Sequence, residues 1–270
     1  MTMVERVERL EAELIFRLSL LNERVRDRMG ITAERIGGGI AVSMVNDPSG
    51  FWSKAQGFGF TEPVTKDLIG EVLDFYRAAG GPVANFHLAP EVLPANWAEI
   101  CEVLGLVEGQ PTLHKLVRDA RPVQQVETSF RIGPIGPEDG EAWAAVQVEA
   151  FRMPDPDGRM VEMLASVNDL PGVTCYAAWD GDKLVATGAL YVDGELGEFV
   201  SAATLPEYRG RGAQSALLAR RVQDALAAGC TTLAVEVVKP ARGEDNPSLN
   251  NVRRAGFEIA YDRPVWTWKA

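Results

Sequence analysis

The chain has 270 residues, of which 46% are hydrophobic, and a formal net charge of −11 at pH 7. This length is enough for two modest hydrophobic cores or one large core. The acidic balance argues against broad nucleic-acid binding, which needs a basic surface, and no apolar run approaches the length that spans a membrane. We therefore expect a cytoplasmic protein without a signal peptide, whose carboxylates mainly keep it soluble.

The cysteines and histidines give no sign of a metal site. Cys101, Cys175 and Cys230 are widely spaced and contain no Cys-x-x-Cys pair, which argues against a zinc site or a disulfide framework. His87 and His114 have no metal-ligand partner at a useful spacing, so we expect packed or surface histidines. We predict no bound metal, and buried free thiols at Cys175 and Cys230.

The first thirty residues are predicted to form one long amphipathic helix. Thr2 and Glu5 have the spacing of a capping box, and apolar residues recur at helical spacing up to Val25, before a stop near Gly30. The opposite face interleaves Glu and Arg, which indicates i,i+4 pairs facing water rather than a membrane surface. We expect this helix to cover a core or to form a dimer interface, which leaves a monomer and a homodimer open.

The following stretch has the pattern of a mixed α/β unit. Its periodicity predicts strands at 39–45, 83–88 and 112–117, and helices at 66–79 and 95–104. Residues 51–59 combine Phe51 and Trp52 with two glycines. This segment forms either the wall of a ligand cleft or a buried aromatic anchor under a loop.

The helical and the strand periodicity of the apolar residues both end near residues 119–127, which divides the chain there. The run Arg121-Pro-Val-Gln-Gln125 suits neither a helix nor a strand. We therefore predict one domain over 1–125 and a second over 126–270.

The second half alternates strands and helices. We predict strands at 130–135, 175–179, 184–191, 199–204, 232–238, 257–261 and 265–268, and helices at 137–150, 215–228 and 248–255. Asp180-Gly181-Asp182 separates two of these strands and is typical of a hairpin turn.

The segment between the 199–204 strand and the 215–228 helix predicts an anion site. Gly210 and Gly212 allow a tight turn whose backbone amides point at one place, and the helix that follows adds its positive end. Arg209 and Arg211 add two guanidinium groups suited to phosphate oxygens. We interpret the loop as a pyrophosphate cradle; the alternative is a Gly-rich surface turn with two solvated arginines.

The spacing of the glycines separates three kinds of phosphate loop. A P-loop needs a lysine after the glycines and a dinucleotide-binding turn needs a third glycine, and neither follows Gly212. In contrast, Arg209-Gly-Arg-Gly-Ala-Gln214, with Thr204-Leu-Pro-Glu-Tyr208 before it, resembles the Arg/Gln-x-x-Gly-x-Gly/Ala signature of the GNAT superfamily of acyl-CoA N-acyltransferases. The resemblance covers about residues 128–270, including the order of strands and helices.

The resemblance implies an α/β (mixed α+β) fold. In the C-terminal half it implies a GNAT domain, with a mostly antiparallel central sheet flanked by helices. The end of the first half is also similar to the end of a GNAT domain, because it consists of a strand, a helix, Gly105-Leu106 and a strand. It lacks the signature. We therefore expect a second, degenerate GNAT-like α/β domain in front, which does not bind coenzyme A and which shapes the acceptor pocket.

The resemblance also implies the co-substrate and its contacts. The loop amides would bind the pyrophosphate of acetyl-CoA, and free amides of the preceding strand would bond the pantetheine arm and the acyl oxygen. The implied coenzyme A contacts are Ala202, Ala203, Thr204, Arg209, Gly210, Arg211, Gly212, Ala213, Gln214, Ser215 and Asn251. Glu198 stands where several members have their general base, and the alternative is a solvated acidic side chain.

Two positions depart from the family pattern. Gln214 stands where glycine or alanine is usual, so its amide either donates to the pyrophosphate or shields the site. Val252 stands where a tyrosine often protonates the leaving thiolate. These departures put the mechanism, rather than the fold, in doubt.

The implied function is transfer of an acetyl group from acetyl-CoA to a primary amine, without a metal. A non-catalytic acyl-CoA-binding or sensing protein is the first alternative, and Gln214 and Val252 favour it. A scaffold protein that dimerises through its N-terminal helix is the second alternative.

Overall fold

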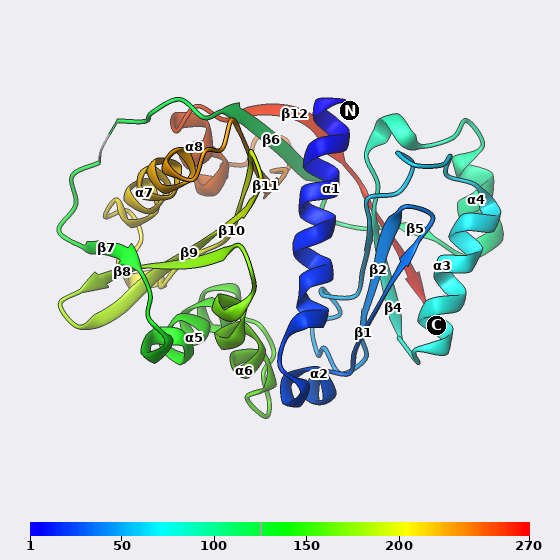
Figure 1. Ribbon diagram of the computed structural model, residues 1–270, viewed down its shortest axis with the longest axis horizontal. Helices are drawn as coiled ribbons and strands as arrows, with labels where there is room; N and C mark the ends of the chain where they lie inside the picture. The colour runs from blue at the N-terminus through cyan, green and yellow to red at the C-terminus, as the bar shows by residue number, and fades with distance from the viewer. Residues whose placement is uncertain (125) are drawn as a thin grey trace. The chain divides into compact units, whose positions relative to one another are not determined.

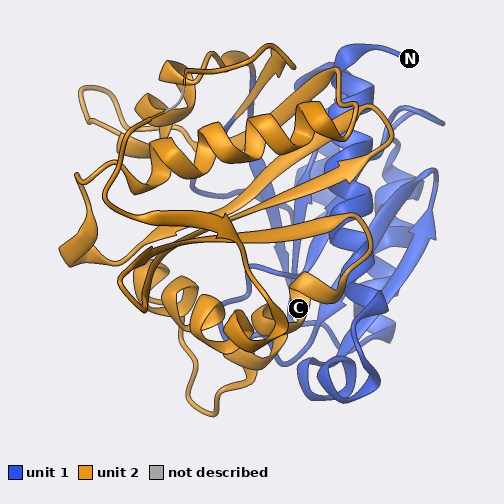
Figure 2. Ribbon diagram, turned by 60° about the vertical axis from the view of Figure 1, so that its left-hand side comes forward, with its two compact units in different colours: residues 1–114, 261–270 blue, residues 115–260 orange. Residues whose placement is uncertain are grey.

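The computed structural model describes residues 1–124 and 126–270, so Gln125, the last residue of the predicted boundary run, lies outside the described residues. The described chain forms two compact units (Figure 2). Unit 1 contains Met1–His114 and Tyr261–Ala270, and unit 2 contains Lys115–Ala260. Unit 1 is therefore built from two separate stretches of chain. The division of the sequence at residue 125 stays a prediction.

Unit 1 contains a six-stranded sheet in the order β1-β2-β3-β4-β13-β5. The strands are β1 (Ile31–Ile36), β2 (Gly39–Met44), β3 (Lys54–Gln56), β4 (Val83–His87), β5 (Val107–Glu108) and β13 (Val265–Lys269) (Figure 1). β3 and β4 are parallel, and the other pairs are antiparallel. Buried apolar side chains of α3 (Lys66–Ala78) and α4 (Trp97–Leu104) complete the core of this sheet.

The N-terminal helix is not continuous, which corrects our prediction. It consists of α1 (Met3–Phe16), a 3-10 turn η1 (Arg17–Leu20) and α2 (Glu23–Met29). The break lies at Asn22, whose side chain accepts a hydrogen bond from the backbone N–H of Val25 at 3.0 Å and so caps α2. At the other end, Thr2 caps α1 as predicted, by accepting from the backbone N–H of Glu5 at 3.1 Å.

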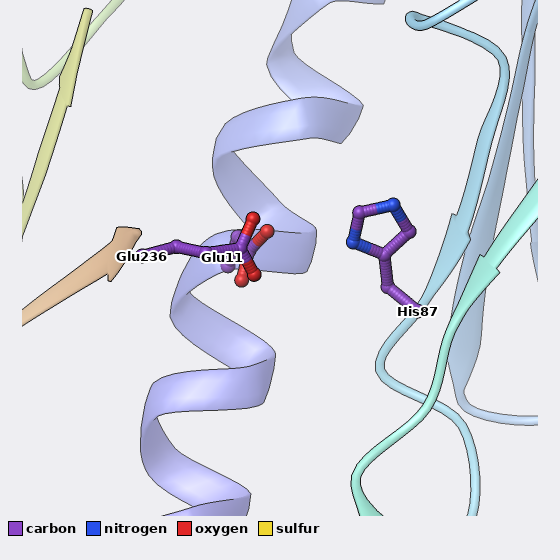
Figure 3. A group of neighbouring side chains, drawn as sticks. All are labelled: Glu11, His87 and Glu236. Carbon is purple, nitrogen blue, oxygen red and sulfur yellow. The ribbon is translucent and has the colours of Figure 1, made fainter. Parts of the chain in front are cut away.

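One side of α1 buries two carboxylates, which corrects the expectation that its acidic residues all face water. Glu8 and Glu11 are 1% and 5% exposed. Arg263, which is fully buried, donates to Glu8 at 2.9 Å and to Glu11 at 2.7 and 2.8 Å. Figure 3 shows His87 beside α1, together with Glu11. Nδ1 of His87 lies 3.2 Å from Nη2 of Arg263. His87 is thus a packed histidine in an ionic cluster.

Unit 2 is built around a seven-stranded sheet in the order β12-β6-β11-β10-β9-β8-β7. The strands are β6 (Leu113–Asp119), β7 (Arg131–Pro134), β8 (Val173–Asp180), β9 (Lys183–Asp193), β10 (Leu196–Thr204), β11 (Thr232–Val238) and β12 (Glu258–Arg263). The pairs from β7 to β10 are antiparallel, and β10 and β11 are parallel.

In the described part of unit 2, four α-helices accompany this sheet: α5 (Gly140–Phe151), α6 (Arg159–Ala165), α7 (Ala213–Ala227) and α8 (Pro247–Arg254). The sequence predicts all of them except α6. Leu217 and Val222 of α7 are fully buried and share one core with Phe199 of β10 and Phe257. No helix among the described residues is long and apolar enough to cross a bilayer.

Two strands lie in sheets that sequence order does not predict. β6 ends the predicted first half but lies between β12 and β11 in the seven-stranded sheet. β13 ends the predicted second half but lies between β4 and β5 in the six-stranded sheet. Hydrophobic periodicity identifies both strands, but it carries no information about the partner with which each one pairs.

The three cysteines are free and buried. Cys175 on β8 is fully buried, and this burial raises the pKa of its thiol to about 12. Burial, reinforced by Glu108, also raises the pKa of the Cys101 thiol to about 11. Both thiols are therefore protonated in the native protein at neutral pH.

The buried thiol of Cys175 predicts a loss of stability at alkaline pH. Its pKa is raised from 9.0 to about 12 in the folded protein, so the unfolded chain releases this proton first as the pH rises. The contribution of the protonated Cys175 thiol to the free energy of unfolding is fully present below pH 9. It is lost towards pH 12, at up to about 1.4 kcal/mol per pH unit. Urea denaturation between pH 8 and 11 measures this slope. It should be shallower in Cys175→Ala, and equal slopes would contradict the assignment.

Candidate functional site

Strand β10 parts from its parallel neighbour in the middle of the sheet. The described β10–β11 pairing ends at Phe199 and Val235. Both strands continue beyond that pair, β10 to Thr204 and β11 to Val238. The second half of β10 therefore has its antiparallel partner β9 on one side and no described pairing with β11 on the other.

A β-bulge lies at the same point of β10. The pairing with β9 is interrupted between Val200 and Ala203, so two residues, Ser201 and Ala202, stand opposite the single residue Gly188. Ser201 has a φ of 58°, in the left-handed region that non-glycine residues rarely adopt. The bulge turns the backbone locally where the pairing with β11 ends.

The loop after β10 has the geometry of an anion site. Gly210 and Gly212 have φ values of 74° and 86°, which favour glycine. Gly212 is the N-cap residue of α7, and no side chain in the described part of the chain caps this helix start. A Cβ atom added at either glycine would meet no heavy atom within 4 Å. An uncapped helix start behind two uncrowded glycines fits a pyrophosphate group.

The two arginines of the loop are exposed but not unpartnered. Arg209 donates through Nε to the backbone carbonyl of Thr204 at 3.2 Å. Arg211 donates to Asp180 at 3.1 Å, and its Cζ lies 4.5 Å from the centre of the Phe130 ring. An exposed ion pair of this kind contributes only about 0–1 kcal/mol, so a phosphate group competes with Asp180 at little cost.

The sequence predicts that the side-chain amide of Gln214 either donates to the pyrophosphate or shields the site. In the structure this amide instead donates to β9 and β10. Its Nε2 atom lies 2.7 Å from the carbonyl oxygen of Ala203, 2.9 Å from that of Thr187 and 3.1 Å from Oγ1 of Thr204. The side chain therefore turns back onto β9 and β10. The side chain of Gln214 is accommodated in the signature because it connects the start of α7 to these two strands by hydrogen bonds. The backbone N–H of Gln214 still belongs to the helix start.

Glu198 is buried, which makes the alternative of a solvated side chain wrong. Its carboxylate is 1% exposed and accepts a hydrogen bond from Nζ of Lys115 at 2.9 Å. Lys115 lies on β6 and is fully buried. Sequence reasoning missed Lys115, because it is 83 positions away and lies in a stretch predicted to belong to the first half.

The α8 helix supplies no hydroxyl group at the position of Val252. Val252 is 4% exposed and packs in the core of unit 2. Asn251 is half-buried, and its side-chain oxygen accepts from Arg254. Asn246 caps the helix by accepting from the backbone of Ser248 at 2.9 Å and of Leu249 at 3.2 Å.

Arg221 is a second residue that sequence reasoning missed. It is 1% exposed, and its Nη1 donates to the carbonyl oxygens of Ala189 at 3.0 Å and Val200 at 3.3 Å, on the two strands beside the bulge. Burial lowers the pKa of Arg221 to about 10, so the guanidinium is still charged at neutral pH. The sequence does contain a signal for this residue, because Arg221 lies in the apolar stripe of α7. A buried arginine there needs buried hydrogen-bond acceptors.

Gly188 leaves the space that Arg221 occupies. A Cβ atom at Gly188 would lie 2.7 Å from Cζ of Arg221. We expect Gly188→Ala to lower the free energy of unfolding by about 1–3 kcal/mol, because a buried guanidinium has to move away from its carbonyls. Chemical denaturation measures this. Gly133→Ala on β7 is the control, since its Cβ would meet nothing within 4 Å, and an equal loss in both variants would contradict the role of Gly188.

Together these features define a mixed α/β protein with an uncapped helix start between β10 and α7, beside a parted strand pair. Residues 141–244 match the Acetyltransferase (GNAT) family. Unit 2 thus contains a GNAT domain, as the signature predicts, and acyl transfer is the class of chemistry that this family supports. No curated protein matches the chain at a significant level.

Solved structures share the fold over three quarters or more of the chain. A GCN5-related N-acetyltransferase from Kribbella flavida is 17% identical, with a TM-score of 0.67 over 99% of this chain and 96% of that chain. A tandem GNAT protein from the clavulanic acid biosynthesis pathway is 12% identical, with a TM-score of 0.62 over 96% of this chain and 94% of that chain. A GCN5-related N-acetyltransferase from Sphaerobacter thermophilus is 17% identical, with a TM-score of 0.58 over 75% of this chain and 66% of that chain.

These likenesses concern the fold. They confirm the predicted mixed α/β class, with a GNAT domain preceded by a second GNAT-like part that lacks the signature.

Proposed function

We propose that the protein transfers an acetyl group from acetyl-CoA to a primary amine. The uncapped start of α7 behind two left-handed glycines is the observation that carries this proposal. In this proposal the pyrophosphate is bound by the segment Arg209, Gly210, Arg211, Gly212, Ala213, Gln214 and Ser215. The positive end of the helix and two guanidinium groups suit its negative charge.

The parted half of β10 is the proposed site of the thioester. Ala202 and Ala203 have small side chains, so the pantetheine arm can lie close to the backbone. The amides from Ala202 to Thr204 would polarise the acyl carbonyl, and Asn251 on α8 would contact coenzyme A. Backbone donors aimed at a developing oxyanion typically contribute about 3–4 kcal/mol each to an acyl-transfer barrier.

Glu198 is the proposed general base. It lies on β10 three residues before Ser201 and therefore close in sequence to the proposed thioester site. The amine must lose a proton to attack the carbonyl, and a positioned carboxylate typically contributes about 10²–10⁴-fold to such a step. In this role the carboxylate takes the proton of the attacking amine while Lys115 holds its Oε1.

Turnover is tested by release of free coenzyme A from acetyl-CoA with a panel of small primary amines and peptides. We expect at least one amine to stimulate release, and Glu198→Gln to lower kcat about 100-fold with an unchanged affinity for coenzyme A. Equal turnover by Glu198→Gln would contradict the role of the base.

An acyl-CoA-binding protein without catalysis is the second candidate. The buried Val252 supports it, since this position offers no proton for the leaving thiolate. Tight coenzyme A binding with no release across the whole panel would favour this candidate over the enzyme. We also propose a cytoplasmic location, because three free cysteines suit a reducing compartment.

A further inference from the structure

Three backbone carbonyls in and beside the bulge of β10 accept hydrogen bonds from side chains. A buried carbonyl without a hydrogen-bond partner costs about 1–3 kcal/mol, so each one needs a donor. Around the bulge, side-chain donors come from two helices and from β9.

Gln147 on α5 provides the first donor. It is 2% exposed, and its Nε2 lies 2.5 Å from the carbonyl oxygen of Ser201, the residue with the left-handed φ. The same Nε2 contacts Oγ1 of Thr187, which itself donates to the Ser201 carbonyl at 3.0 Å. Both side chains are buried, so no water replaces them readily.

Helix α7 provides further donors. Gln214 at its first turn donates to the carbonyl of Ala203, on the far side of the bulge, at 2.7 Å. Arg221, two turns later, donates to the carbonyl of Val200, on the near side, at 3.3 Å. The carbonyls of Val200, Ser201 and Ala203 are thus each bound by a side chain from a helix.

We infer that Gln147 and Gln214 are positioning residues for acyl transfer, which hold the bulged backbone of β10 in the geometry that receives the thioester. This inference rests on the proposed function. Gln147 does not belong to the signature loop, so it acts through the backbone of Ser201 and through Thr187, which also donates to that carbonyl. Gln214 acts on both ends of the site, because its side chain binds β10 while its backbone belongs to the pyrophosphate loop.

Gln147→Glu is the sharpest test, because it keeps the size of the side chain and replaces the N–H donor with an acceptor. We expect kcat for acetyl-CoA to fall about tenfold while its KM changes less than about twofold, since the pyrophosphate loop is untouched. Gln214→Glu should lower kcat and raise KM, because it also loosens the start of α7. Gln223→Glu on the exposed side of α7 is the control and should change neither constant.

Hydrogen exchange of the unliganded protein gives an independent readout. Amides in 199–205 should exchange about tenfold faster in Gln147→Glu and Gln214→Glu than in the wild type, with exchange in β8 unchanged. Unchanged exchange in 199–205 would overturn the inference, as would faster exchange with an unaltered kcat. A wild type that binds no coenzyme A, with the exchange differences present, would overturn the proposed function and the positioning role, while the network would remain a property of the fold.

Discussion

Lys115→Met is expected to lower the free energy of unfolding by about 3–5 kcal/mol. Lys115 is fully buried and Glu198 is 1% exposed, and the two side chains are joined at 2.9 Å. Removing the ammonium takes away a hydrogen bond and a positive charge from beside a buried carboxylate, and breaking a buried ion pair from one side is strongly destabilising. Urea denaturation followed by circular dichroism measures the loss.

Two further variants separate this effect from a general loss of a lysine. Lys183→Met removes an exposed lysine whose pair with Glu207 has a distance of 3.4 Å, and we expect no measurable change in stability. Lys115→Met combined with Glu198→Leu removes both charges and should recover most of the loss. A double variant as unstable as Lys115→Met alone would show that the charge on Glu198 is not the cause.

Gly212→Trp is expected to weaken coenzyme A binding at least about 100-fold, which is a loss of about 2.7 kcal/mol. The indole group would project over the uncapped start of α7, where the pyrophosphate is proposed to bind. A native-state ligand raises the melting temperature, so differential scanning fluorimetry with coenzyme A reports the change. The wild type should be stabilised by coenzyme A, and Gly212→Trp should not.

The opposite end of the same helix offers a matched control. Gly229 has a φ of 87°, against 86° for Gly212, and a Cβ atom at either residue would meet nothing within 4 Å. Gly229→Trp should therefore carry the same backbone strain and keep coenzyme A binding. Loss of binding in both variants would assign the effect to strain rather than to the loop.

The geometry of the loop between β10 and α7 is predictable from the sequence because its determinants are local. A strand, two glycines and a helix follow one another directly, so Gly210 and Gly212 and the missing cap of α7 follow from neighbouring residues. The elements of the GNAT domain are predictable for the same reason. Their hydrophobic periodicity depends only on which face each element buries.

The buried charges of the two units are not predictable in this way. Lys115 and Glu198 are 83 positions apart, and Glu8 and Arg263 are 255 positions apart. Acidic residues interleaved with basic ones on α1 have the pattern of a solvated helix face, and only the tertiary packing shows which carboxylates are buried. The pairing of β6 and β13 is equally non-local, which is why the sequence predicts these strands but not their sheets.

The most direct test of the account compares two ligands by isothermal titration calorimetry on the wild-type protein. Coenzyme A carries the pyrophosphate together with its adenosine 3′-phosphate, and pantetheine has the same thiol arm without either group. If the start of α7 binds the pyrophosphate, coenzyme A should bind at least about 100-fold more tightly than pantetheine, a difference of about 2.7 kcal/mol. Equal affinities, or no binding of coenzyme A, would contradict the account.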